Sequence, residues 1–251
     1  MVKATEFGNR LISLFKQDKL DRFPEQWGLT IRGNGTISIV GYCTNLTPRT
    51  VDEAIRNGVD LILTHHDAWP FMFGMQEVCA SKLEEHGISS AFFHYALDDA
   101  DFGTNAALAE KLALRNIEKS ALYKDLYYVG RIGEWECGKS FDNLRVLLEN
   151  ILCEPVRAWR NHDRSIKKVC IVTGSGAVTD LIKEAIDRGC DAYITGEKSL
   201  YAVEYAQFAG IDLFLGSHTA TELPGVERLA QLIAEEFSFL QVVHLHDDPI
   251  E

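Results

Sequence analysis

Histidine and carboxylate side chains follow four predicted strands of the chain, at the ends where open α/β sheets bind their ligands. Imidazole nitrogen and carboxylate oxygen are the usual protein ligands of zinc, iron and manganese, so this set predicts a metal site. The chain has only eight histidines, and four of them stand at these ends. The seven side chains are His65 and His66 after strand 61–64, His94 and Asp98 after strand 88–93, Glu197 after strand 192–195, and His218 and Glu222 after strand 211–216.

The adjacent pair His65 and His66 is the most informative part of this set. Neighbouring residues of a strand point to opposite faces of the sheet, so packing alone explains two consecutive histidines poorly. Just beyond a strand end both rings can reach one cavity and ligate metal there. A carboxylate can also bridge two ions about 3.5–4 Å apart, as in hydrolytic two-metal sites. The alternative for each single histidine is a polar cap or a hydrogen-bonded core residue.

The elements that must position these residues occur twice in the sequence. Segments 37–66 and 168–197 align without a gap at an offset of 131 residues. Each reads as strand, turn, helix, glycine cap and strand, with Gly58 and Gly189 where a left-handed residue commonly ends a helix. Short apolar runs after these glycines are typical of buried parallel strands.

The similarity continues, because in both halves a strand ends at a histidine with a carboxylate four residues later. Helices around 108–112 and 229–233 follow, and Pro224 suits the first turn of the second one. We therefore predict an α/β fold of two related lobes, whose mixed, largely parallel sheets face each other across a dinuclear metal site. The single unit 1–251 would contain lobes of about 30–115 and 165–251, joined by a connecting segment 116–164.

Composition limits the classes of function. The 251 residues carry a net charge of −12, which disfavours duplex nucleic acid and anionic membrane surfaces as partners. No apolar run approaches the ~20 residues of a membrane-spanning helix, and the start lacks the features of a signal peptide. Six cysteines show no C-x-x-C spacing, which argues against a zinc finger or a thioredoxin-like motif. We expect a globular protein of the reducing cytoplasm.

The sequence around the histidines resembles the GTP cyclohydrolase 1 type 2 family, whose members are also described as NGG-interacting-factor-three-like dinuclear metal proteins. The similarity spans nearly the whole chain from residue 37 onward, and the matching stretches follow one another in the same order as in the family. This chain resembles the short form of the family. The matching stretches are DLILTHHDAWP (60–70), HYALDDADFGTNAALAEKL (94–112), GRIGE (130–134), DAYITGE (191–197) and GSHTATELPGVERLA (216–230).

The resemblance implies a specific ligand set and an assembly. His94 and Glu197 match family positions at the same strand ends, and we expect them to orient a ligating imidazole rather than to bind metal. The family also implies a homo-oligomer, a hexameric ring built from dimers. The implied cofactors are two divalent ions (zinc, iron or manganese), bound by His65, His66, Asp98, His218 and Glu222, with Asp98 or Glu222 bridging.

Two metal ions with nitrogen and oxygen ligands suit hydrolysis. For GTP, the resemblance implies attack of metal-bound hydroxide on the guanine imidazole ring and release of formate. A triphosphate would need a basic cluster, for which Arg131, Arg157, Arg160 and Lys198 are available. A phosphoesterase or another amidohydrolase acting on a small molecule fits the ligands equally well. The alternative is a non-catalytic metal-binding, metal-handling or protein-interaction module, and the sequence assigns no catalytic residue.

Three weaker signals have structural interpretations beside functional ones. The glycine-rich turn 173–176 fits a tight turn better than a phosphate cradle. His244 and His246 share one face of a late strand, which is better explained by half-exposure than by a second metal site. Trp69 lies in the loop after the histidine pair and is a candidate substrate-binding residue. Its neighbouring aromatic residues, Phe71 and Phe73, would either stack on a base or fill a subunit contact.

Overall fold

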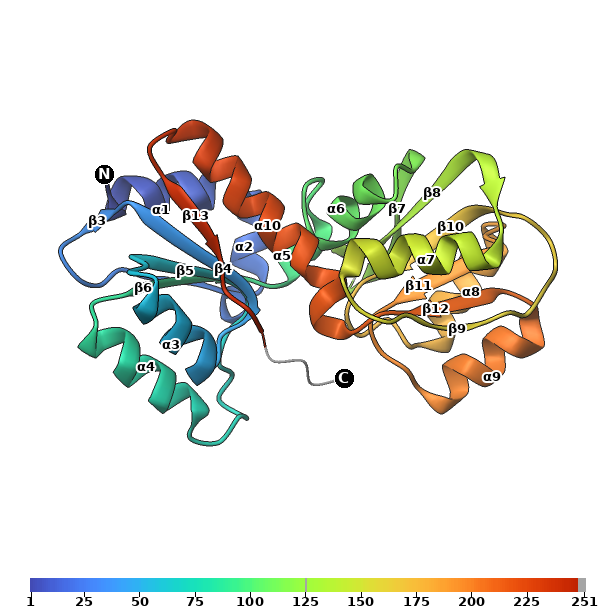
Figure 1. Ribbon diagram of the computed structural model, residues 1–251, viewed down its shortest axis with the longest axis horizontal. Helices are drawn as coiled ribbons and strands as arrows, with labels where there is room; N and C mark the ends of the chain where they lie inside the picture. Colours follow the sequence, from blue (N-terminus) through green and yellow to red (C-terminus); the bar gives the residue numbers. More distant parts are fainter. Residues whose placement is uncertain (125, 248–251) are drawn as a thin grey trace. The chain divides into compact units, whose positions relative to one another are not determined.

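The computed structural model describes residues 1–124 and 126–247, which form two compact units (Figure 1). The first unit contains Met1–Phe102 and the C-terminal segment from Val226 onward, and the second contains Gly103–Gly225. The chain passes between the units after Phe102 and again within helix α10 (His218–Glu236). These two units have other bounds than the lobes 30–115 and 165–251, and the relatedness of the lobes stays a prediction.

The first unit is built on a five-stranded sheet in the order β13-β4-β5-β6-β2 (Figure 1). Neighbouring strands are parallel except at the edge, where β2 runs antiparallel to β6, and a separate antiparallel pair joins β1 to β3. The elements are β1 (Val2–Lys3), α1 (Ala4–Ser13), α2 (Gln17–Arg22), the 3-10 helix η1 (Pro24–Gln26), β2 (Trp27–Thr30), β3 (Thr36–Ile37), β4 (Ile39–Asn45), α3 (Pro48–Arg56), β5 (Leu61–His66), α4 (Met75–Glu85), β6 (Ser89–Phe93), α5 (Tyr95–Asp99) and β13 (Gln241–His244).

The hydrophobic core of the first unit has two layers, one on each face of the sheet, and successive side chains of β5 point into them alternately. Leu61 and Leu63 face a layer formed with α1, α2 and the C-terminal part of α10. Ile62 faces the opposite layer, formed with α3 and α4. A strand buried on both faces reads as a continuous apolar run, which is why the sequence signals β5 clearly.

The second unit has a six-stranded mixed sheet in the order β7-β8-β10-β11-β12-β9. Its centre, β10-β11-β12, is parallel, whereas β7, β8 and β9 pair antiparallel. Helices α6 and α7 pack on one face, and α8 and α9 on the other. The elements before α10 are α6 (Thr104–Lys111), β7 (Arg115–Tyr123), β8 (Tyr127–Lys139), α7 (Phe141–Leu152), β9 (Arg157–Trp159), β10 (Ile166–Val172), α8 (Thr179–Asp187), β11 (Ala192–Thr195), α9 (Leu200–Ala209) and β12 (Asp212–Leu215).

The α/β class with mixed sheets of parallel and antiparallel strands is confirmed. Strand β5 was expected to end at residue 64, but it extends through His65 and His66. Two further local expectations were wrong. In the first copy of the predicted repeat, Val40 pairs with Leu61. A gapless alignment would then pair Ala192 with the residue two positions after Val169, but Ala192 pairs with Val169 itself. The turn after β10 therefore holds two extra residues. Pro224 lies inside α10, which begins at His218, and not in the first turn of a later helix. Gly58 and Gly189 both have the predicted left-handed backbone.

Among the described residues, no helix has the length and apolar character needed to cross a membrane. The segment 116–164, expected to connect two lobes, contributes β8, β9 and nearly all of β7 to the sheet of the second unit. All six cysteines are free thiols, and the four at positions 43, 79, 170 and 190 are buried.

Candidate metal centre

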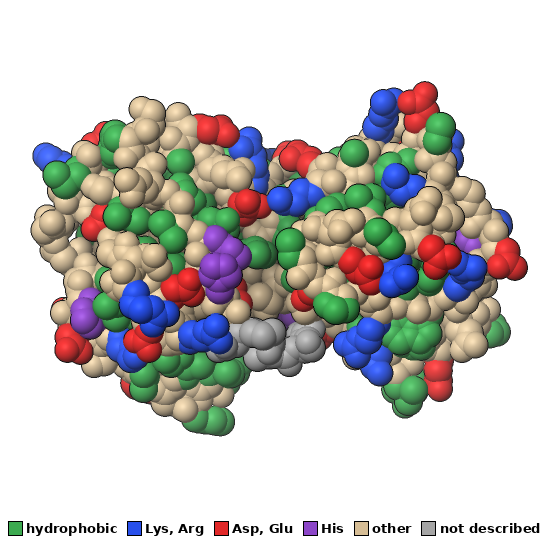
Figure 2. Space-filling view, in the orientation of Figure 1, with side chains coloured by type: hydrophobic (Ala, Val, Ile, Leu, Met, Phe, Trp, Pro, Cys, Tyr) green, Lys and Arg blue, Asp and Glu red, His purple; other side chains and the backbone are tan. Residues whose placement is uncertain are grey.

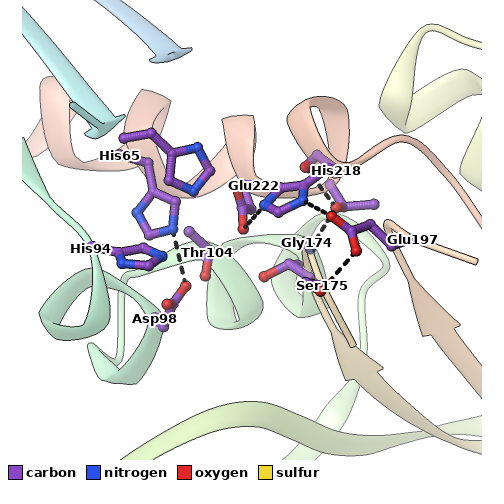
Figure 3. A network of polar contacts seen from close by, with 12 residues as sticks. His65, His94, Asp98, Thr104, Gly174, Ser175, Glu197, His218 and Glu222 are labelled. Atoms are coloured by element: carbon purple, nitrogen blue, oxygen red, sulfur yellow. Dashed lines mark hydrogen bonds and ion pairs between the residues drawn. The ribbon is translucent and has the colours of Figure 1, made fainter. Parts of the chain in front are cut away.

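In the first unit, three histidines converge at the ends of β5 and β6 (Figure 3). The ring centroids of His65 and His66 lie 4.6 Å apart, and those of His65 and His94 lie 4.9 Å apart. One ring nitrogen from each of the three can be chosen so that all lie within 4.8 Å of one another. His94 is thus placed as a possible ligand, beyond the orienting role expected for it.

A carboxylate joins this group from the short helix after β6. His94 caps the N-terminus of α5, and Asp98 lies one turn further on, where its backbone N–H donates to the His94 carbonyl. The Asp98 Oδ1 atom is 3.3 Å from Nε2 of His65. Both side chains are buried, so a positive charge beside them would offset the cost of burying the Asp98 carboxylate.

Each of the three clustered imidazoles uses Nδ1 to contact an oxygen. For His65 this is the backbone carbonyl of Phe93 at 2.8 Å, which can only accept, so Nδ1 carries the hydrogen. The side-chain carbonyl of Asn45 lies 2.8 Å from Nδ1 of His66, and that of Gln26 lies 2.5 Å from Nδ1 of His94. In all three rings Nε2 is therefore the nitrogen presented to a metal.

The second unit holds its own set on the first turn of α10 (Figure 3). His218 and Glu222 are four residues apart on this helix and therefore lie on one face, with Nε2 of His218 3.1 Å from Oε1 of Glu222. On the other side of the ring, Nδ1 contacts Glu197 at 2.6 Å. The hydroxyl of Ser175 donates to the other oxygen of Glu197 at 2.7 Å and fixes that carboxylate.

These two carboxylates determine the charge of His218. Burial acts to lower the pKa of the imidazole, but hydrogen bonds to Glu222 and Glu197 and their negative charges raise it to about 9. The set therefore favours a cation at this position, which in the absence of metal is the imidazolium itself.

Glycines let the first turn of α10 approach the strand ends of the second unit. Gly174 follows β10 with a φ of +61°, and a Cβ there would lie 2.0 Å from Oε1 of Glu222 and 2.8 Å from Nε2 of His218. A Cβ on Gly196, after β11, would lie 2.7 Å from Cα of His218. The turn 173–176 is thus explained by this close approach and by the hydrogen bond from Ser175.

We expect Gly174→Ala to displace His218 and Glu222 and to reduce metal binding. The matched control is Gly189→Ala, where φ is +72° but no atom lies within 4 Å of the added Cβ. The control should lose only the ~1–2 kcal/mol that a left-handed backbone costs an L-residue, whereas Gly174→Ala should lose more. Urea unfolding and metal content measure the two effects, and equal losses in the two variants would contradict this account of Gly174.

Of the aromatic residues in the loop after the histidine pair, only some lie at the candidate site. The Trp69 ring lies 5.7 Å from His94 and 5.5 Å from Phe92, as centroid distances, and therefore lines the histidine group. Phe71 stacks on Trp69 at 6.3 Å, whereas Phe73 is 95% exposed.

A cavity of about 380 Å³ lies in the first unit between the β2–β6 edge and α4. Its wall combines the ring of Phe92 with the polar side chains of Arg32, Asp67 and Ser90. Asp67 follows the histidine pair directly, and burial raises the pKa of its carboxyl. Because Phe92 also contacts Trp69, an aromatic wall links this cavity to the histidine group.

Two of the four basic residues considered for a triphosphate, Arg131 and Arg160, serve other contacts. The buried Arg131 donates to the carbonyls of Gly130 and Tyr128, and Arg160 pairs with Asp142. Over the face shown in Figure 2, Lys and Arg side chains are interspersed with Asp and Glu. A basic cluster built on Arg131 and Arg160 is therefore not supported.

Sequence reasoning missed the oxygens that hold the imidazoles. Asn45 ends β4 and so fits the same strand-end rule that identified the histidines, which means that the rule could have found it. Gln26 precedes β2, which is antiparallel to β6, so no strand-end signal points to it. Ser175 was assigned to a tight turn, and only the position of Glu197 reveals its contact.

Comparisons with known proteins cover almost the whole chain. The family model described as Duf34/NIF3 (NGG1p interacting factor 3) matches residues 2–249. A Haemophilus influenzae protein named GTP cyclohydrolase 1 type 2 homolog is 29% identical over 232 residues, which cover 88% of this chain and 89% of the relative. A Pyrococcus abyssi protein of the same name is 27% identical over 216 residues, which cover 84% of this chain and 85% of the relative.

Solved structures share the fold. TTHA1606 from Thermus thermophilus matches with a TM-score of 0.84 at 21% identity, covering 100% of both chains. Reduced HcgD from Methanocaldococcus jannaschii matches with a TM-score of 0.81 at 22% identity, covering 98% of both chains.

Proposed function

The chain belongs to the Duf34/NIF3 family, and from this membership and the geometry of its histidines we propose that it is a metal-dependent hydrolase. Four imidazoles carry the proposal, because His65, His66, His94 and His218 each direct Nδ1 at an oxygen. Metal-ligating histidines almost always donate their second ring N–H to a carbonyl or carboxylate in this way.

The donor set fits two divalent ions of the zinc, iron or manganese type. It contains only imidazole nitrogens and carboxylate oxygens, without a thiolate. We propose His65, His66, Asp98, His218 and Glu222 as ligands, with Asp98 or Glu222 bridging. His94, whose ring nitrogen can join those of His65 and His66, is an additional candidate ligand.

The protein's own residues hold and shape such a centre. A divalent metal bound there would supply Lewis acidity, which lowers the pKa of a bound water to about 7 and polarises the bond to be cleaved. Phe93, Asn45 and Gln26 fix the three clustered imidazoles of the first unit, those of His65, His66 and His94, and Glu197 holds the Nδ1 proton of His218. Trp69 and the cavity beside it offer an aromatic wall and polar groups for a small substrate.

GTP is one substrate within this proposal, because the curated relatives are named GTP cyclohydrolase 1 type 2 homologs. Ring opening of guanine with release of formate would be its reaction. A homo-oligomer, with a hexameric ring as the specific form, belongs to the same proposal, and the exposed Phe71 and Phe73 are available for a subunit contact. The free thiols suit a reducing compartment such as the cytoplasm.

A substrate screen of metal-loaded protein tests the proposal. The panel contains GTP, GMP and guanosine, a set of phosphoesters, and cyclic amides and amidines, each assayed with loaded and with chelator-treated protein. We expect at least one class to be hydrolysed only by the loaded protein, and metal added back to the treated sample should restore the rate. A fully loaded sample that hydrolyses none of them would contradict the hydrolase and favour a metal-binding or metal-handling module.

A further inference from the structure

The C-terminal segment of the chain binds the end of strand β4. Beyond β13, which pairs with β4 in parallel, the carboxylate of Asp247 accepts a hydrogen bond from the backbone N–H of Thr44 at 2.9 Å. Its other oxygen accepts from the backbone N–H of Asn45 at 3.0 Å and from the side-chain Nδ2 of the same residue at 3.0 Å. One carboxylate therefore holds both the backbone and the side chain of Asn45.

This contact fixes which way the Asn45 amide points. A carboxylate can only accept hydrogen bonds, so the NH₂ group of Asn45 must face Asp247. The amide oxygen then faces His66, whose Nδ1 lies 2.8 Å away. An amide oxygen also only accepts, so the hydrogen of His66 is placed on Nδ1 and the lone pair on Nε2.

We propose that Asp247 and Asn45 are positioning residues for His66, which together set its tautomer and its ring orientation for metal binding. The inference rests on the proposed metal centre. The negative charge of Asp247 polarises the Asn45 amide, so its oxygen becomes a stronger acceptor for His66. The last described residue of the chain thereby acts on a histidine 181 positions earlier in the sequence.

The competing explanation is that Asp247 only ties the C-terminal segment to the sheet. The neighbouring residue supplies a matched control for this possibility. His246 ties the same segment to α3, because its backbone N–H and its Nδ1 both contact the carboxylate of Glu53 at 2.9 Å. His246→Ala therefore loosens the segment without removing a contact to Asn45.

The experiment measures the His66 tautomer and the metal affinity in the full-length protein. Imidazole ¹⁵N shifts at pH 8, read from metal-free protein with His66 assigned by a His66→Gln variant, report the tautomer. Zinc affinity is measured by competition with a chromophoric chelator. The variants are Asn45→Ala, Asp247→Ala and Asp247→Asn, with His246→Ala as the control. Asp247→Asn keeps the size of the side chain and serves where the alanine variant folds poorly.

We expect wild-type His66 to be the Nδ1–H tautomer, and Asn45→Ala to convert it to a mixture and weaken zinc binding by about 10–100-fold. Both Asp247 variants should change in the same direction, whereas His246→Ala should match the wild type. The inference is overturned if the Asp247 variants keep the wild-type tautomer and affinity, or if His246→Ala weakens zinc binding as much as Asp247→Ala. If no variant and no wild-type sample binds zinc but the tautomer still depends on Asn45 and Asp247, the proposed function fails and the positioning of His66 stands.

Discussion

Glu222→Gln is expected to weaken metal binding by more than about 100-fold, because loss of a direct ligand should exceed the ~10–100-fold cost of losing an outer partner. Glutamine keeps the size of the side chain but removes its negative charge, and the Glu222 side chain is only 4% exposed. The change therefore tests ligation with little change in packing. Competition with a chelator of known affinity measures the effect, and circular dichroism checks that the fold is retained.

The control for this variant is Glu204→Gln, an exposed carboxylate on α9 of the same unit, which should bind metal as the wild type does. His65→Gln makes the equivalent change in the first unit and should weaken binding to a similar extent. Wild-type affinity in Glu222→Gln would remove this residue from the ligand set. Loss of affinity in only one of the two variants would mean that a single unit binds the metal.

The histidines and their carboxylates were predictable because their positions follow from local rules. Strand β5 is buried on both faces and reads as an apolar run, so its position could be predicted, although it extends through His65 and His66 rather than ending before them. Parallel strands align their carboxyl ends at one edge of a sheet, which brings His65, His66 and His94 together in the first unit. The same rule locates His218 after a strand of the second unit, whereas its position beside Glu222 follows from α10, which begins at His218, earlier than expected.

The contacts that orient the rings depend on tertiary pairing and could not be read from spacing. Gln26 reaches His94 because β2 joins the sheet as an antiparallel edge strand. Asp247 reaches Asn45 because β13 pairs with β4, two elements separated by most of the chain.

Two other errors have local causes. The gapless repeat overlooked two extra residues in the turn after β10, where Gly174 admits the first turn of α10. Pro224 was taken as a sign of a helix start, but α10 begins six residues earlier and accommodates the proline within the helix.

The central claim is that this chain holds a dinuclear metal centre, and elemental analysis of the wild-type protein tests it most directly. Five proposed ligands exceed what one tetrahedral zinc ion uses. Protein purified without chelators, then supplemented with zinc, iron or manganese and dialysed, is expected to retain about two ions per chain of its preferred metal. Less than half an ion per chain with every metal supplied would contradict the centre and, with it, the proposed hydrolase.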